Sequence, residues 1–167
     1  NIVTADSIID LSNYFVMPGM IDCHTHVLLQ GDITSEDYDV QVLKESIPYR
    51  TIRATKSAEK SLMNGFTTIR DLGTEGAGFA DVDIKKAINR GVTNGPRMIV
   101  STLAMNTTGH YPLKAADYAW ELHFPKGVIE ITGADEARRA ARQQIEQGAD
   151  WIKIYADRGY YRLPDGS

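Results

Sequence analysis

The hydrophobic and polar positions along the chain form two alternating patterns. Short apolar runs rich in β-branched and aromatic residues predict strands, and longer stretches with apolar residues three or four positions apart predict helices. Glycines separate each helical stretch from the next strand, so a helix–glycine–strand unit recurs three times. This order indicates a parallel sheet with right-handed crossovers, which is an α/β fold. The predicted strands are residues 20–26, 66–70, 97–102 and 151–155, and the predicted helices lie at residues 49–63, around 84–88, and 132–147.

Two further details follow from the same pattern. Residues 103–131 show no clear periodicity and predict a long irregular loop, a feature that is uncommon without a function. In the last helix, Ala137, Ala141 and Ile145 are predicted to form the buried face. The candidate architectures are an open doubly wound sheet and part of a closed (β/α) barrel. A G-x-G-x-x-G turn after the first strand would favour the doubly wound sheet, and there is none. In both architectures the chemistry sits at the carboxyl ends of the strands.

Composition narrows the class of protein. The chain has 167 residues, of which 43% are hydrophobic and 24% charged, which is ordinary for one globular domain. A formal charge of −4 argues against a nucleic-acid partner. Cys23 is the only cysteine, so an internal disulfide is excluded, and no apolar run approaches the roughly 20 residues of a membrane span. We expect a cytoplasmic protein, although an exported form whose signal peptide has been removed stays open.

The sharpest chemical feature is the pair His24 and His26 at the end of the first predicted strand. Side chains alternate along a strand, so histidines two positions apart point to the same side and can converge on one divalent metal. Asp22 shares that side and could accept a hydrogen bond from a metal-bound ring. A chance spacing of two exposed histidines is the alternative, and two ligands do not complete a zinc site.

Lys153 lies inside the apolar run of residues 151–155, on the opposite side from its isoleucine neighbours. There it would face the interior of a barrel or the top of a sheet. A neutral lysine amine can react with carbon dioxide to form a carbamate, whose two oxygens could bridge two metal ions. The alternatives are a lysine paired with a buried carboxylate such as Asp71, or one that reaches solvent.

Three other residues near the predicted strand ends are candidates for lesser roles. His110 follows the third strand, where it could polarise a substrate carbonyl. Tyr155 shares the side of Lys153 and could border a substrate pocket or pack in the core. The side chain of Cys23 points to the opposite face of the strand from those of the histidine pair. We therefore expect Cys23 to pack beneath a helix rather than act as a nucleophile.

Together these segments resemble the metal-dependent amidohydrolase superfamily. Residues 17–26 (MPGMIDCHTH) are similar to its first-strand signature, in which an apolar Pro-Gly-x-Ile-Asp run leads into His-x-His. Residues 65–73 (GFTTIRDLG), 95–97 (GPR), 108–110 (TGH) and 148–154 (GADWIKI) resemble, in order and spacing, one branch of that superfamily. The branch holds imidazolonepropionase-like enzymes and zinc-dependent Xaa-Pro dipeptidases, or prolidases.

The resemblance implies a domain organisation. Residues 15–167 would be the first four β/α units of a TIM-type (β/α)8 barrel. Residues 1–14 would be a remnant of a small β domain. The resemblance also implies a homo-oligomer and a small-molecule or dipeptide substrate.

The resemblance also implies a metal site and a chemistry. His24 and His26 would bind one of two divalent metal ions, zinc by resemblance, and Lys153 as its carbamate would bridge both. His110 would be the catalytic residue that contacts substrate near the scissile carbonyl, and Tyr155 would border the substrate.

Three functions stay open at this stage. The leading prediction is hydrolysis of a peptide or amide C–N bond by a metal-activated bridging water, with an Xaa-Pro dipeptidase or carboxypeptidase type of substrate. A second is ring-opening hydrolysis of a cyclic amide, as in imidazolonepropionase-like or dihydroorotase-like enzymes. A third is a non-catalytic metal-binding fragment.

The 167 residues contain three of the implied metal ligands and no implied general base. We therefore expect this chain alone to hydrolyse nothing. A dipeptidase assay of the isolated chain with added zinc checks this, and a zinc-dependent rate above the uncatalysed background would contradict it.

Overall fold

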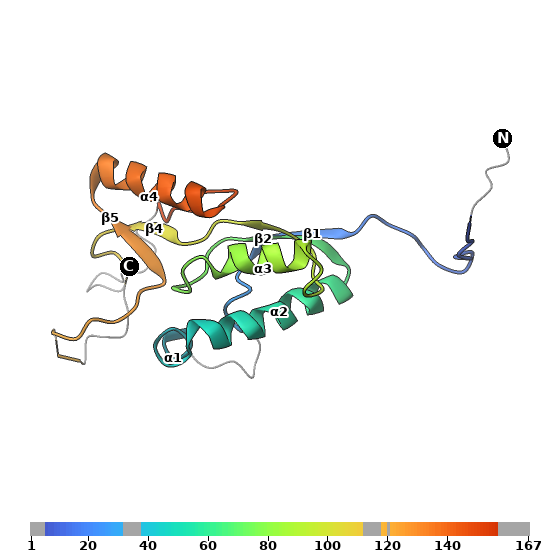
Figure 1. The fold of residues 1–167 in the computed structure, drawn as a ribbon, viewed down its shortest axis with the longest axis horizontal. Helices are drawn as coiled ribbons and strands as arrows, with labels where there is room; N and C mark the ends of the chain where they lie inside the picture. Colours follow the sequence, from blue (N-terminus) through green and yellow to red (C-terminus); the bar gives the residue numbers. More distant parts are fainter. Residues whose placement is uncertain (1–5, 32–37, 112–117, 120, 157–167) are drawn as a thin grey trace, which may run out of the picture.

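The computed structural model describes residues 6–31, 38–111, 118–119 and 121–156. Strands and helices alternate along much of the chain, as the sequence pattern predicts (Figure 1). The elements are β1 (Met20–Thr25), α1 (Tyr38–Lys44), α2 (Ile47–Met63), β2 (Phe66–Asp71), α3 (Ala80–Asn89), β3 (Arg97–Val100), β4 (Ala104–Thr107), β5 (Val128–Ile131) and α4 (Gly133–Gln147).

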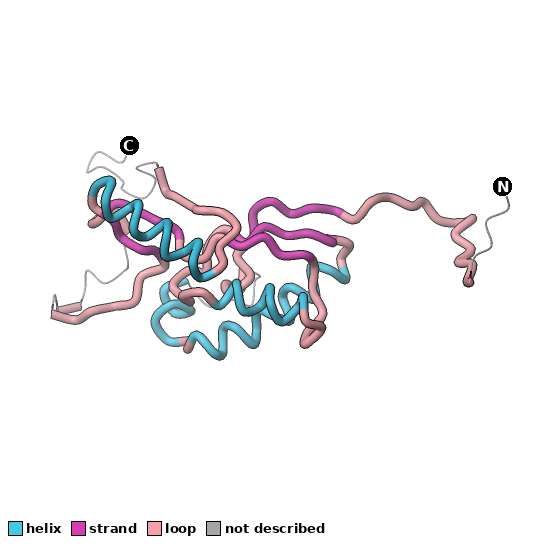
Figure 2. The backbone as a smooth tube through the Cα atoms, turned by 45° about the horizontal axis from the view of Figure 1, so that its top comes forward, coloured by secondary structure: helices cyan, strands magenta, loops and turns pink. Residues whose placement is uncertain are grey.

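The first three strands form one parallel sheet in the order β1-β2-β3. Ile69, in the central strand, is paired with Asp22 on one side and Met98 on the other. Helices α2 and α3 lie on the same side of this sheet (Figure 2). Ile69, Ile84 and other apolar side chains are fully or nearly fully buried between the helices and the sheet. The predicted α/β class with parallel strands is confirmed.

A second parallel sheet lies within the stretch predicted to be irregular. It pairs β4 with β5, so the prediction of a structureless loop over residues 103–131 was wrong in part. Both strands are four residues long, and β4 reads Ala-Met-Asn-Thr, which carries no apolar alternation. Thr102 has a left-handed backbone (φ 58°) and separates β3 from β4.

The segment predicted as the fourth strand runs beside β4. The N–H of Met105 donates to the carbonyl of Lys153 and the N–H of Tyr155 donates to the carbonyl of Met105, both at 2.9 Å. These bonds make one parallel bridge, between Met105 and Ile154, rather than a strand. The predicted strand at residues 151–155 is therefore present only as this single bridge beside β4.

Helix α4 has the predicted span, and its predicted buried face is right in part. Ala137 and Ala141 are half-buried on the same face as the buried Ala140 and Gln144, whereas Ile145 is 60% exposed, so the prediction was wrong for Ile145. The hydroxyl of Thr102 donates to Oε1 of Gln144 at 3.0 Å. The buried face of α4 therefore combines small apolar side chains with one buried polar contact.

Residues 6–19 extend away from both sheets before β1 begins (Figure 1). Their apolar side chains, including Ile8 and Phe15, are exposed. Among the residues that the structure describes, no helix is long and apolar enough to cross a membrane.

Asp81, in the first turn of α3, joins this helix to the turn between β3 and β4. Its Oδ2 accepts the backbone N–H of Thr102 at 2.8 Å, and its Oδ1 accepts that of Val82 at 2.8 Å. The side chain is fully buried. Burial raises the pKa of Asp81 to about 6, and the backbone hydrogen bonds offset this only in part.

The raised pKa of Asp81 predicts a pH dependence of stability. The folded protein binds this proton more tightly than the unfolded chain does, so stability falls as pH rises from about 4 to about 6. The shift corresponds to about 3 kcal/mol. We expect Asp81→Asn to flatten this part of the profile, measured by urea denaturation of the intact protein from pH 4 to pH 7.5. Asp83→Asn, at an exposed position of the same helix, is the control and should leave the slope unchanged.

Candidate functional site

Two histidine rings face each other where β1 ends. The Nε2 atoms of His24 and His26 are 3.3 Å apart, and the ring centroids are 5.3 Å apart. Nδ1 of His26 lies 3.0 Å from the carbonyl oxygen of Gly73, beyond the end of β2. A carbonyl can only accept, so Nδ1 of His26 carries the proton and its Nε2 presents a lone pair. The structure thus brings the predicted pair together.

The spacing of this pair fits a metal ion. Zinc binds imidazole nitrogens at about 2.0–2.1 Å in a tetrahedral arrangement, which places two such nitrogens about 3.3–3.4 Å apart. A histidine whose other nitrogen donates to a carbonyl is also the usual form of a metal ligand. Among the described residues, no group of three or more His, Cys, Asp or Glu side chains could hold a metal ion. In the described part of the chain, these two histidines alone would therefore make at most part of a metal site.

Positive groups near His24 favour its neutral ring. Partial desolvation lowers the pKa of His24, and the neighbouring His26 and Lys153 lower it further. The ammonium of Lys153 lies 5.3 Å from the centre of the Tyr155 ring. A neutral imidazole is the form that binds metal, so the electrostatics agree with the geometry.

Two expectations about β1 need correction. The Oδ1 atom of Asp22 accepts the backbone N–H of His24 at 3.0 Å, so the structure shows it shaping the strand end rather than orienting a ring. Cys23 is exposed and not packed beneath a helix. β1 lies at an edge of the described sheet, and most of its side chains are exposed, which explains why the alternation did not bury Cys23.

Asp71, the last residue of β2, is fully buried next to the loop that follows β1. Its Oδ1 accepts the N–H of Val27 at 2.9 Å, which fixes the backbone directly after His26. Its Oδ2 has no hydrogen-bond partner among the described residues. Burial raises the pKa of Asp71 well above its ordinary value, and the nearby Asp81 adds to this. The alternative in which Lys153 pairs with Asp71 is not found.

A second carboxylate, that of Glu75, lies closer to the histidines and was missed by the sequence reasoning. Oε1 of Glu75 is 3.4 Å from Nδ1 of His26 and accepts the hydroxyl of Tyr155 at 3.2 Å. Oε2 accepts the hydroxyls of Tyr38 at 2.7 Å and Tyr111 at 3.4 Å. Four side chains from separate segments therefore converge on one carboxylate.

The surroundings of Glu75 are closely packed. Glu75 is only 5% exposed, and burial raises its pKa, which His26 and Tyr155 partly offset. A Cβ atom at Gly127 would lie 2.1 Å from the Tyr38 hydroxyl, 2.2 Å from that of Tyr111 and 2.8 Å from Oε2 of Glu75. Only glycine fits beside this carboxylate. Sequence pattern does not reveal such a contact, because it joins residues far apart in the chain.

Arg50 of α2 holds the loops that carry these side chains. Its Nε donates to the carbonyl of Leu28 at 3.1 Å, and its Nη2 donates to the carbonyls of Thr74 at 3.1 Å and Glu75 at 2.9 Å. The side chain is 1% exposed, and burial lowers its pKa. The planar guanidinium joins the loop after β1 to the loop after β2, which no lysine could do with the same geometry.

The other predicted site residues lie at the same end of the strands. His110 follows β4, and its backbone N–H donates to the carbonyl of Thr107 at 3.0 Å. No contact described joins His110 to the histidine pair, whereas its neighbour Tyr111 contacts Glu75. Tyr155 turns its hydroxyl to Glu75 and its ring to Lys153.

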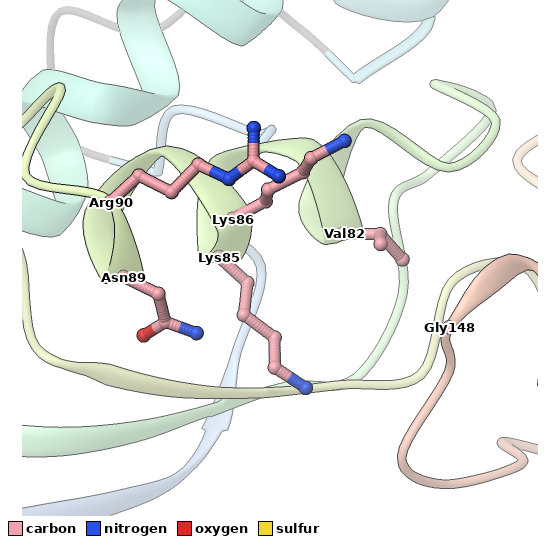
Figure 3. A pocket seen from close by; sticks show the side chains of 6 residues that line it. All are labelled: Val82, Lys85, Lys86, Asn89, Arg90 and Gly148. Carbon is pink, nitrogen blue, oxygen red and sulfur yellow. The ribbon is translucent and has the colours of Figure 1, made fainter.

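A shallow pocket of about 190 Å³ lies elsewhere, along α3 (Figure 3). It contains none of the predicted site residues. Its lining residues are Val82, Lys85, Lys86, Asn89, Arg90 and Gly148. Lys85 donates to both carboxylate oxygens of Asp150 at 2.6 and 2.7 Å, so this cation is already paired.

Parallel strands covered by helices, with two converging histidine rings at the carboxyl end of the first strand, define an α/β protein with a candidate site at the strand ends. Residues 15–163 match the amidohydrolase family. The chain belongs to this family.

Individual relatives agree with this assignment. The chain is 32% identical over 164 residues to ochratoxinase of Aspergillus niger, covering 90% of this chain and 32% of that protein. It is 27% identical over 108 residues to imidazolonepropionase of Pseudomonas entomophila, covering 58% of this chain and 26% of that protein. The chain thus spans between about a fifth and a third of the length of the curated relatives it matches.

Solved structures show the same similarity. A crystal structure of an amidohydrolase superposes with a TM-score of 0.71 at 33% identity, covering 92% of this chain and 37% of that one. A prolidase complexed with N-methylphosphonate-L-proline gives a TM-score of 0.65 at 28% identity, covering 89% and 38%. The fold is therefore similar to that of amidohydrolases with TIM barrels.

The three hydrogen bonds of Arg50 predict a large loss of stability on substitution. Arg50→Met would leave the buried carbonyls of Leu28, Thr74 and Glu75 without donors, at a cost of about 3 kcal/mol or more. Arg50→Lys should recover only part of the lost stability, because a single ammonium cannot reproduce the planar set of donors of a guanidinium. Urea denaturation of the intact protein checks both. Arg53→Met, on the same helix and paired with Glu45, is the control and should cost much less; equal losses at the two positions would contradict the assigned role of Arg50.

Proposed function

We propose that this chain is part of a metal-dependent hydrolase of peptide or amide C–N bonds, of the Xaa-Pro dipeptidase or carboxypeptidase type. Membership of the amidohydrolase family supports hydrolysis of such bonds. The observation that carries the proposal is the 3.3 Å separation of the two Nε2 atoms of His24 and His26, with Nδ1 of His26 donating to Gly73. A bound pair of divalent metal ions, zinc by preference, would supply a hydroxide nucleophile near neutral pH and would polarise the amide carbonyl.

The residues of this chain divide the supporting tasks. His24 and His26 would hold one metal ion through their Nε2 atoms. Lys153 would hold both ions as its carbamate: the ammonium would first lose one proton, and the neutral amine would then add carbon dioxide and release a second, which converts a cation into an anionic ligand. Its closeness to His24 supports this assignment.

Substrate contacts would come from the loops after β4 and beside Lys153. His110 would donate to the scissile carbonyl, and Tyr155 would border the substrate from the side of Lys153. Prolidase structures that superpose on most of this chain support a dipeptide substrate, and ochratoxinase supports a larger amide.

Ring opening of a cyclic amide is the second candidate. Imidazolonepropionases are among the curated relatives, at 25–30% identity over about half of this chain or more. The same metal and histidine pair would serve both reactions, so the substrate must be determined by assay.

Metal content and substrate preference test the proposal together, both measured on the longer protein of which we propose this chain is part and not on the 167 residues alone. We expect the wild type to bind divalent metal and to hydrolyse Xaa-Pro dipeptides or ochratoxin faster than cyclic imides. His24→Ala and His26→Ala should each lose activity by about a thousandfold or more, because the metal-generated nucleophile is lost. Elemental analysis and initial rates are the measurements.

The control is His123→Ala, an exposed histidine away from the pair. It should keep the metal content and the rate of the wild type. Faster turnover of cyclic imides would favour the second candidate. Metal content unchanged in both His24 and His26 variants would contradict the metal site.

A further inference from the structure

Glu75 is where the loops at this end of the fold meet. Its carboxylate is contacted by Tyr38 at the start of α1, His26 after β1, Tyr111 after β4 and Tyr155 beside β4. At least 12 positions separate any two of these four side chains along the chain. These contacts together hold the carboxylate of Glu75 in one orientation. In this orientation its Oε1 atom faces His26.

The backbone at Glu75 is also constrained. Glu75 adopts a left-handed conformation (φ 50°), which is costly for a residue with a Cβ atom. Arg50 holds its carbonyl at 2.9 Å, and the next residue, Gly76, approaches the carbonyl of Lys126 so closely that a Cβ would lie 2.9 Å from it. Strain that is maintained by several independent contacts commonly marks a functional position.

We propose that Glu75 is a positioning residue for His26: its negative charge keeps the imidazole proton on Nδ1 and thereby keeps Nε2 as the nitrogen available to a metal ion. The carbonyl of Gly73, 3.0 Å from Nδ1, accepts the hydrogen bond of this proton. Oε1 of Glu75, at 3.4 Å, adds a charge that a carbonyl lacks. The two tautomers of an imidazole are otherwise close in energy, so the partners of one nitrogen decide the state of the other.

The tyrosine hydroxyls hold the carboxylate of Glu75 in place. Tyr38 gives the shortest contact, 2.7 Å to Oε2, and so fixes the end of the carboxylate that is turned away from His26. Tyr155 shares Oε1 with His26, which ties the segment of Lys153 to the same carboxylate. Partners of metal-bound histidines commonly change metal affinity by about 10- to 100-fold when removed. The inference rests on the proposed function only in taking His26 as a metal ligand.

The test compares Glu75→Gln with wild type in the intact protein, using two readouts. The first is zinc affinity, by competition with a chromophoric chelator. We expect a loss of about 10- to 100-fold. The second is the tautomer of His26 in metal-free protein, from long-range proton–nitrogen NMR correlations of nitrogen-labelled histidine. We expect Nδ1–H alone in the wild type, and a mixture with Nε2–H in Glu75→Gln.

Glu59→Gln is the matched control, since Glu59 lies on α2 and is paired with Lys56. It should change neither readout. Tyr38→Phe is the second variant if Glu75→Gln does not fold, and it should lower zinc affinity by about 3- to 10-fold, as expected for one lost hydrogen bond.

The outcomes separate the inference from the proposed function. If the wild type binds zinc and His26→Ala weakens it, but the Glu75 and Tyr38 variants match the wild type in affinity and tautomer, the inference is overturned and the metal site stands. If zinc binding is the same in the wild type and His26→Ala, the proposed function fails. The tautomer of His26 then still decides whether Glu75 controls its proton.

Discussion

The buried carboxylate of Glu75 and the buried guanidinium of Arg50 connect the loops that carry the candidate chemistry. Arg50 donates to the backbone carbonyls of the loops after β1 and β2, and Glu75 accepts from the side chains of three further segments. Buried charges are costly unless their hydrogen bonds are satisfied. Each of these two groups is satisfied only when the loops lie together, so the cost of burying them enforces the arrangement at the strand ends.

This arrangement holds the histidine pair in position without a bound metal ion. The strand spacing brings His24 and His26 to one side, but spacing alone leaves both rings free to rotate. The carbonyl of Gly73 and the carboxylate of Glu75 restrict the ring of His26, and Asp71 fixes the backbone directly after it. A preorganised ligand loses less conformational freedom on binding, which favours metal affinity.

The sequence predicts those parts of the fold that depend on local chemistry. The strands at residues 20–25 and 66–71, helix α2 and the span of α4 follow from periodicity, and Ser46 and Pro48 explain why α2 begins two residues before its apolar pattern. The His24–His26 pair follows from the two-residue repeat of a strand. Helix α1 and strands β4 and β5 escape prediction because they contain only four to seven residues with little apolar pattern.

The remainder of the site depends on contacts between distant residues. Glu75 reads as a loop residue, and nothing in its neighbours shows that Tyr38, Tyr111 and Tyr155 reach it. Gln144 was missed on the buried face of α4 for the same reason, since its partner there is the hydroxyl of the distant Thr102. Long-range polar contacts of this kind have no periodic signature in a single sequence.

The central claim is that His24 and His26 bind one metal ion through their Nε2 atoms. A crystal of the intact protein grown with zinc, with anomalous data collected on both sides of the zinc absorption edge, tests it most directly. The account predicts a zinc peak about 2.1 Å from both Nε2 atoms, with Nδ1 of His26 still donating to Gly73. A map without zinc at this position, in which the two rings hydrogen-bond directly to each other, would contradict it.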